Sequence, residues 1–173
     1  MRRTRESETT MPTKEKFKLR HATLADAEKI FALIHLHADD LVPRPMGDVV
    51  ANVDRFTVAE ADGEMVGCAA YSILPEIGSP LHATVEVQSV AVRKPYRRLG
   101  IGRALVQAVA EEAAAFRPAE ILVLTFAPAF FASLGFTEIP KTQVMHKLYS
   151  GCINCTKHAS PFTCPEKAMV RKA

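Results

Sequence analysis

Residues 87–105 read VQSVAVRKPYRRLGIGRAL, and this stretch decides the fold. An apolar, β-branched run typical of a strand ends in a basic loop, which closes on Gly100-Ile101-Gly102 just before an Ala/Leu/Val-rich helix. The first turn of a helix has unpaired N–H donors and the positive end of the helix dipole. Glycines let a phosphate approach those donors closely, and Arg97, Arg98 and Arg103 add positive charge at the same point. The stretch therefore predicts a strand–loop–helix unit that holds a pyrophosphate.

Two other glycine motifs fit this stretch less well. The dinucleotide fingerprint needs a third glycine three residues after Gly102 and a later acidic residue, and neither occurs at the required spacing. The sequence also has no Gly-x4-Gly-Lys-Ser/Thr run, which argues against a nucleoside-triphosphate loop. An ordinary strand–turn–helix with a glycine turn is the remaining alternative.

The composition is that of one soluble globular domain. The 173 residues are 48% hydrophobic and 24% charged, and no apolar run approaches the ~20 residues that cross a bilayer. Residues 1–16 are polar and lack the apolar core of a signal peptide, so we expect a disordered tail and a cytoplasmic protein. The net charge of +3 is concentrated in residues 1–16 and 141–173, while the body between them is acidic. This distribution argues against nucleic acid as a partner, and the lack of a long apolar run argues against a membrane.

Hydrophobic periodicity predicts an alternation of strands and helices. Thr23 and Asp26 have the spacing of a capping box at a helix start, Asp62-Gly63 is a hairpin-turn pair, and Pro75–Pro80 is typical of a loop. The expected strands are 17–19, 56–60, 65–74, 84–92, 121–125 and 144–148, and the expected helices are 24–38, 48–54, 102–116 and 128–134.

The run Arg97-x-x-Gly100-x-Gly102 after a strand, followed later by FFASLGF at 130–136, resembles the pattern of the GNAT superfamily of N-acetyltransferases. The resemblance implies an α/β (α+β) fold in which helices flank a mixed, mostly antiparallel central sheet. It also implies acetyl-CoA as cosubstrate, in a cleft where two central strands splay. Backbone N–H groups of Val90, Ala91 and Val92 would bind the coenzyme arm and the thioester. The other implied coenzyme contacts are Arg97, Arg98, Leu99, Gly100, Ile101, Gly102, Arg103 and Phe131.

Within the superfamily, the chain is most similar to the acetyltransferase domain of bacterial N-acetylglutamate synthases, in their short, stand-alone form. This resemblance implies acetyl transfer to the α-amino group of L-glutamate, the first step of arginine biosynthesis. It covers about residues 17–150, so we divide the chain into a tail (1–16), the acetyltransferase domain (17–150) and a Cys-containing extension (151–173). The segments that carry it are LVPR (41–44), RFTVAE (55–60), VGCAA (66–70), VEV (85–87), LVLT (122–125) and FFASLGF (130–136).

Glu86 is the candidate general base. It lies in an apolar strand just before the coenzyme-binding segment, and a carboxylate among apolar neighbours accepts a proton more readily. The resemblance also matches Glu86 to the family's glutamate in the corresponding strand. The alternative interpretation is a solvent-facing Glu or a salt-bridge partner.

Arg44 and Gln88 are the candidate acceptor-binding residues. By resemblance, Arg44 matches an arginine that meets a substrate carboxylate, and arginine binds carboxylates in a bidentate fork. The alternative for Arg44 is a surface arginine. Gln88 stands where short-form relatives often have Arg, and Ala127 stands where kinase-fused relatives have Arg. Lys141, Lys147 or the backbone are then the remaining partners for a second carboxylate.

Phe131 stands where many relatives have a Tyr that can protonate the leaving thiolate. The proton could then come from water or from another group such as Tyr149, or the thiolate could leave unprotonated. His35 and His37 are two residues apart and therefore lie on different faces of a helix. One of them can reach the pocket; the alternative is one surface and one half-buried histidine.

The extension carries a Cys-x2-Cys pair, which is half of a typical zinc site. The candidate ligands are Cys152, Cys155, Cys164 and His158, with His146 as another possible fourth ligand. A redox pair or reduced structural thiols are the alternatives, and short-form synthases often carry a Cys-Ile-Asn-Cys tail of this kind. Cys68 lies in a strand and is expected in the core.

Two further functions stay open at this point. One is acetylation of another amino acid or a small amine such as a polyamine, although a polyamine site should be acidic and Arg44 opposes that. The other is a binding module without catalysis, which senses acetyl-CoA or a metal through the Cys tail. The expected partner is a small-molecule substrate, and a homodimer is a possible assembly.

Overall fold

The computed structural model describes residues 17–76 and 79–173. The strands are β1 (Phe17–His21), β2 (Phe56–Ala61), β3 (Glu64–Glu76), β4 (Ser79–Val92), β5 (Ile121–Thr125), β6 (Thr137–Ile139) and β7 (Lys167–Arg171). The helices are α1 (Ala27–Leu36), α2 (Met46–Ala51), α3 (Ile101–Ala114), α4 (Pro128–Ala132) and α5 (Met145–Ser150). Single 3₁₀ turns lie at Leu24–Asp26, Val53–Arg55, Lys94–Tyr96, Lys141–Val144 and Cys152–Asn154.

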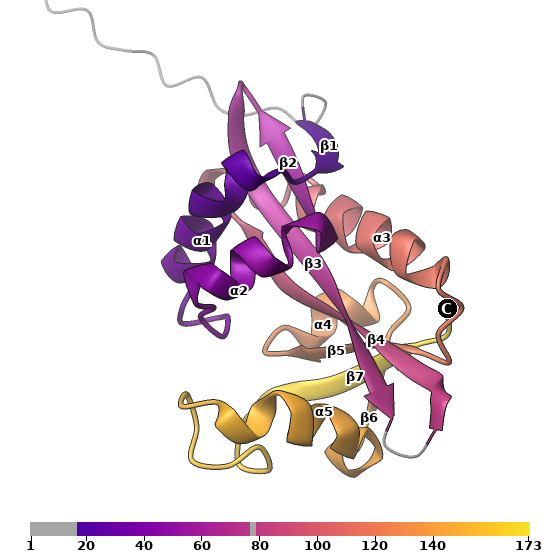
Figure 1. Cartoon of the computed structure of the whole chain (residues 1–173). Coiled ribbons are helices and arrows are strands. Elements are labelled where there is room, and N and C mark those ends of the chain that lie inside the picture. The colour runs from indigo at the N-terminus through magenta and orange to yellow at the C-terminus, as the bar shows by residue number, and fades with distance from the viewer. Residues whose placement is uncertain (1–16, 77–78) are drawn as a thin grey trace, which may run out of the picture.

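All the described strands form one sheet in the order β1-β2-β3-β4-β5-β7-β6 (Figure 1). Strands β1 to β4 pair with their neighbours in antiparallel fashion, and β5 runs parallel to β4. Strand β7 is antiparallel to both β5 and β6. The sheet is therefore mixed and mostly antiparallel, which confirms the expected fold class.

Several local signals are confirmed by the backbone. The N–H of Thr23 donates to the Asp26 carboxylate at 2.8 Å, as the capping box predicts. Asp62 and Gly63 have φ angles of 52° and 78°, as a tight hairpin turn between β2 and β3 requires. The loop predicted at Pro75–Pro80 is too long, because β3 continues to Glu76 and β4 begins at Ser79. Residues 77–78 between them lie outside the described part of the chain. The expected disordered tail, 1–16, lies outside it as well.

The end of the chain differs from expectation. The strand predicted at 144–148 is wrong, because these residues belong to a 3₁₀ turn and helix α5. The fold includes two strands that the periodicity did not predict, β6 and β7. Strand β7 comes from the extension after residue 150 and lies between β5 and β6 in the sheet.

Side chains alternate between the two faces of the sheet, and each face has its own core. Val85, Val87 and Ile121 pack with α3 and α4 on one face. On the opposite face, α1 and α2 cover one end of the sheet, and Leu122 packs with Val144 near α5 at the other end. Glu86 lies between Val85 and Val87 in β4, so its side chain points to this second face.

Strand β4 changes its pairing in the middle of the sheet. Cys68 of β3 pairs with Ala91, but Ala70 pairs with Gln88, so β4 has a bulge at Ser89 and Val90. Ser89 has a φ of 55°, which is left-handed backbone. Pairing between β4 and β5 is recorded only at Val85 with Ile121 and Glu86 with Leu122. The two strands therefore diverge beyond Glu86.

Candidate active site

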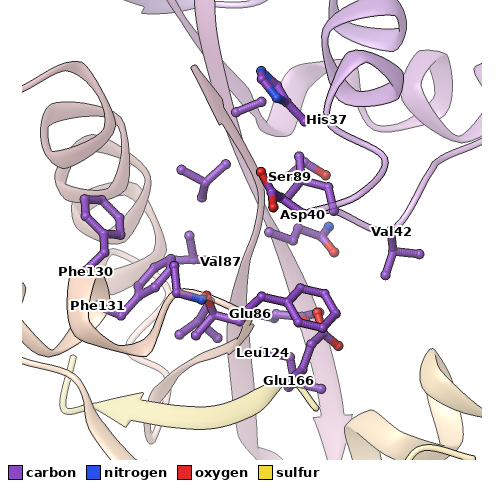
Figure 2. A pocket seen from close by; sticks show the side chains of 18 of the residues that line it. His37, Asp40, Val42, Glu86, Val87, Ser89, Leu124, Phe130, Phe131 and Glu166 are labelled. Atoms are coloured by element: carbon purple, nitrogen blue, oxygen red, sulfur yellow. The ribbon is translucent and has the colours of Figure 1, made fainter. Parts of the chain in front are cut away.

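A cleft of about 870 Å³ lies where β4 and β5 diverge. Residues 86–92 of β4 form one wall, and residues 123–127 of β5 and the following loop form another. The loop between α1 and α2, the arginine loop before α3 and the segment after α5 complete the lining. In Figure 2, Glu86 and Glu166 lie toward one end of the cleft and His37 toward the other, with Phe130 and Phe131 along one side. The cleft is thus bounded by segments from most of the described chain.

Glu86 lies in this cleft as a buried, ion-paired carboxylate. Its side chain is 5% exposed, and the ammonium of Lys147 donates to Glu86 Oε2 at 2.7 Å. Lys147 comes from α5 and is itself only 15% exposed. Glu86 is therefore a salt-bridge partner, as one of the sequence alternatives proposed, and its carboxylate also faces the cleft. The role as a base stays a prediction.

The loop before α3 contains left-handed backbone and leads directly into the helix. Arg98 and Gly100 both have left-handed φ angles, 66° and 88°, and Gly100 is the N-cap of α3. The N–H of Ala104 makes the first helical bond, to the Gly100 carbonyl at 3.0 Å. The N–H groups of residues 101–103 precede this bond and point out of the helix start. Gly102 is close to Phe130, since a Cβ there would lie 3.5 Å from the ring.

The arginines of this loop differ in their contacts. Arg97 donates from Nε to the Val92 carbonyl at 3.2 Å, and its NH2 lies 3.1 Å from His37 Nδ1 and 3.7 Å from Asp40. Arg103 reaches Ser133, with 3.2 Å from NH2 to Oγ. Arg98 is exposed and lines the cleft. All three arginines line the cleft, and they come from the loop before α3 and from its first turn.

The other expected coenzyme contacts divide into two groups. Val90, Ala91 and Val92 line the cleft beside the bulge of β4, with no partner strand from β5 recorded along them. Phe131 also lines the cleft and is 5% exposed, packed edge-on against Phe130 and Phe136. Leu99 and Ile101 differ, because their side chains pack into the core under α3 and do not line the cleft. A ligand could meet these two residues only through their backbone.

Arg44 and Gln88 both line the cleft. The Arg44 side chain is 20% exposed, donates from Nε to Ser89 Oγ at 2.8 Å and pairs with Asp48 one turn along. Its guanidinium is thus held beside the bulge of β4. Ala127 lines the cleft as well, and its N–H donates to Thr125 Oγ1 at 2.9 Å.

Of the two histidines, His37 reaches the cleft and His35 does not. His37 is 4% exposed, and burial lowers its pKa, with the Arg97 charge acting in the same direction. His35 is exposed and its Nδ1 contacts the Phe31 carbonyl at 2.9 Å. Tyr149, considered as a proton donor, is 58% exposed and is absent from the lining.

One charged group in the lining, Glu166, was missed at the sequence level, and the contacts of a second, Lys141, were not foreseen. Burial raises the pKa of Glu166, whose carboxylate lies 3.7 Å from the Cys164 sulfur, and the Glu86 charge adds to this rise. Lys141 had been considered only as a carboxylate partner, but its ammonium donates to the Pro161 and Cys164 carbonyls at 2.8 and 2.5 Å. Both groups depend on the folding of the segment after α5, which has no local sequence signal.

The candidate zinc ligands do not form a metal centre within the described residues. No cluster of three or more His, Cys, Asp or Glu side chains in the described residues has the geometry of a metal site. Cys152, Cys155 and Cys164 are free thiols, and together with His158 they line the cleft. Burial raises the pKa of the Cys152 and Cys164 thiols and raises the pKa of the core residue Cys68 to about 12. The structure therefore places the three sulfur atoms of the Cys tail in the lining of the cleft.

Three features are typical of the acetyltransferase class of fold. They are the bulge in β4, the divergence of the parallel strands β4 and β5, and the arginine-rich loop at the start of α3. The sequence profile of the acetyltransferase (GNAT) domain matches residues 52–138, and the chain belongs to this family. It is 30% identical to an uncharacterized N-acetyltransferase of Chlorobaculum tepidum over 155 residues, which are 88% of this chain and 94% of that protein.

Two matches from Mycobacterium tuberculosis extend the comparison. An amino-acid acetyltransferase is 32% identical over 136 residues, covering 76% of this chain and 74% of that protein. A crystal structure of a protein in complex with CoA and NLQ superposes with a TM-score of 0.74 at 25% identity, covering 90% of this chain and 99% of that one. The chain is therefore a GNAT-family N-acetyltransferase, and it is similar to proteins named amino-acid acetyltransferases. Among the described helices, none has the length and apolar character of a membrane span.

Proposed function

We propose that this N-acetyltransferase transfers the acetyl group of acetyl-CoA to the α-amino group of L-glutamate. The observation that carries the proposal is the buried carboxylate of Glu86 at the divergence of β4 and β5, in a cleft that also holds Arg44 and Lys147. A proton acceptor beside two cations suits an acceptor that carries both an ammonium and carboxylates.

The coenzyme is expected along β4 and at the start of α3. The unpaired N–H groups of residues 101–103 suit a diphosphate, and Arg97, Arg98 and Arg103 supply compensating charge. Val90, Ala91 and Val92 lie where β4 has left β5, so their backbone can bind the pantetheine arm and the thioester oxygen. The CoA in the similar M. tuberculosis structure supports this assignment.

The acceptor side is expected between Arg44 and Lys147. An arginine binds a carboxylate through two parallel hydrogen bonds, and the side chain of Arg44 is already fixed by Ser89 and Asp48. Lys147 can meet the second carboxylate from the opposite wall, and Gln88 lies in the lining nearby. The amino-acid acetyltransferase relative supports an amino acid as the acceptor.

The chemistry then needs one proton to leave the acceptor before the new bond forms. Glu86 accepts that proton, directly or through a water, so that the amine nitrogen has a free electron pair. The C–N bond forms as the C–S bond of the thioester breaks, and CoA leaves with the electron pair on sulfur. The nitrogen then loses its second proton to water or to this thiolate, which completes the amide. Phe131 has no proton to donate, so the proton that neutralises the thiolate does not come from this position.

A thiol-release assay over the twenty amino acids and a polyamine tests the proposal, with Glu86→Gln as the inactive control. We expect L-glutamate to give the highest kcat/KM. A higher kcat/KM for another amine would reject glutamate as the acceptor. If calorimetry detects acetyl-CoA binding but no acceptor gives thiol release, the proposed reaction fails while the coenzyme site stands.

A further inference from the structure

Residues 151–166 cross the cleft as a strap between α5 and β7. They line the cleft on the side of Glu86 and Lys147, and the charges of both residues act on the pKa of the Cys152 thiol. The arginine loop and the first turn of α3 contribute other lining residues, among them Tyr96, Arg97 and Arg103. The strap residues in the lining include Cys152, Cys155 and Cys164.

Lys157 fixes this strap to the opposite wall of the cleft. Its ammonium donates to the carbonyls of Ala38, Asp39 and Leu41 at 2.7, 2.9 and 3.1 Å. A lysine ammonium has three donors, so these three carbonyls satisfy it fully. The same ammonium lies 4.9 Å from the centre of the Phe126 ring, which adds a cation–π contact.

The strap has a second anchor at its other end. Lys141 donates to the Pro161 and Cys164 carbonyls, so both anchors are lysines bonded to backbone rather than to carboxylates. Lys157, however, is the anchor that joins the strap to the loop after α1, which is 116 to 119 residues away in the sequence. Loss of its charge would remove the three hydrogen bonds that tie the strap to the loop after α1.

We propose that Lys157 is a positioning residue that selects the acceptor: it holds the strap across the acceptor side of the cleft, so that a free amino acid enters and a peptide N-terminus does not. The inference rests on the proposed function, since it assumes that the acceptor amine approaches Glu86. A peptide would carry its chain past the α-carboxylate position and into the strap. The free amino acid ends there and fits beneath it.

The first test compares Lys157→Met with Lys172→Met, an exposed lysine outside the cleft lining. In Lys157→Met we expect the KM for L-glutamate to rise about tenfold, equivalent to about 1.4 kcal/mol. We expect kcat and the KM for acetyl-CoA to stay within about threefold, because this anchor touches neither Glu86 nor the start of α3. The activity on L-glutamylglycine relative to L-glutamate should rise at least about fivefold. Equal behaviour of the two variants would overturn the proposal.

The second test does not need an acceptor and so separates this inference from the proposed function. The strap thiols Cys152, Cys155 and Cys164 are half-buried, whereas Cys68 is fully buried in the core and reports on overall folding. We expect a maleimide to label the strap thiols about tenfold faster in Lys157→Met than in Lys172→Met, with Cys68 unlabelled in both. Fast labelling in the unmodified protein, or equal rates in the two variants, would show that Lys157 does not hold the strap.

Discussion

Glu86→Gln is the substitution that most directly tests the chemistry. The change preserves the size of the side chain but removes the proton acceptor and the charge that pairs with Lys147. General-base catalysis contributes about 10²–10⁴-fold, so we expect kcat to fall by at least about a hundredfold. Acetyl-CoA affinity should change by less than about threefold, because the coenzyme loop is not in contact with Glu86.

The same substitution also affects stability, and the size of that effect follows from burial. Glu86 is 5% and Lys147 15% exposed, so removing one partner leaves a buried, uncompensated ammonium. Breaking a buried pair in this way costs about 3 kcal/mol, which corresponds to a fall in Tm of about 6–12 °C for a domain of this size. A loss of activity could therefore come from partial unfolding, and the single variant does not separate the two causes.

The double variant Glu86→Gln/Lys147→Met separates them. Removing both charges relieves the buried ammonium, so we expect most of the lost Tm to return. Activity should not return, because no carboxylate is left in β4 to accept the proton. Thermal melts and thiol release measured below the lowest Tm give both readouts. If the double variant regains kcat, or if Glu86→Gln retains kcat within about threefold, the role of Glu86 as base is refuted.

Four other substitutions test separate parts of the molecule. Arg44→Ala should raise the KM for L-glutamate more than it lowers kcat, and an unchanged KM in steady-state assays would remove Arg44 from the acceptor site. Gly67→Ala should destabilise the fold by about 1–3 kcal/mol, because its Cβ would lie 2.9 Å from a side chain of α3 and 3.1 Å from a carbonyl of β4. Gly47→Ala in α2 meets nothing within 4 Å, and denaturant titration should find it neutral or stabilising. Asp26→Asn should destabilise most at neutral pH: Arg20 lowers the pKa of Asp26, so the stability that this carboxylate contributes is present above about pH 4 and is lost as pH falls. A difference in unfolding free energy between Asp26→Asn and the unmodified protein that does not shrink between pH 7 and pH 3 would contradict this.

The elements that could be predicted from the sequence are those set by local signals. The strand at 121–125 is a continuous apolar run, and the glycine turn at 100–102 coincides with the start of α3. Helix α5 shows the limit of this approach. Val144 and Leu148 are both buried, and a spacing of four residues is compatible with one face of a strand and with one face of a helix. A window this short does not distinguish the two periods.

The parts of the site that could not be predicted depend on contacts between distant segments. Strand β7 has charged residues at both ends and only three apolar residues, so nothing local indicates that it pairs between β5 and β6. The resemblance to short synthases could identify Glu86 and Arg44 as candidate site residues because they lie in recognisable motifs. The resemblance could not identify Glu166 or Lys157, because their positions depend on the path of the chain after α5.

The Glu86–Lys147 pair connects the fold to the chemistry through this returning segment. Lys147 comes from the helix that had been predicted as a strand, and the alternation of a strand would have turned its side chain away from Val144 and Leu148. In the helix, Lys147 follows Val144 by three residues, so its ammonium lies on the side that packs onto the sheet and reaches Glu86. A buried ion pair is seldom worth more to stability than an apolar pair of the same size. Stability alone therefore gives little reason for a carboxylate at this position, and its location in the cleft where β4 and β5 separate favours a role in proton transfer.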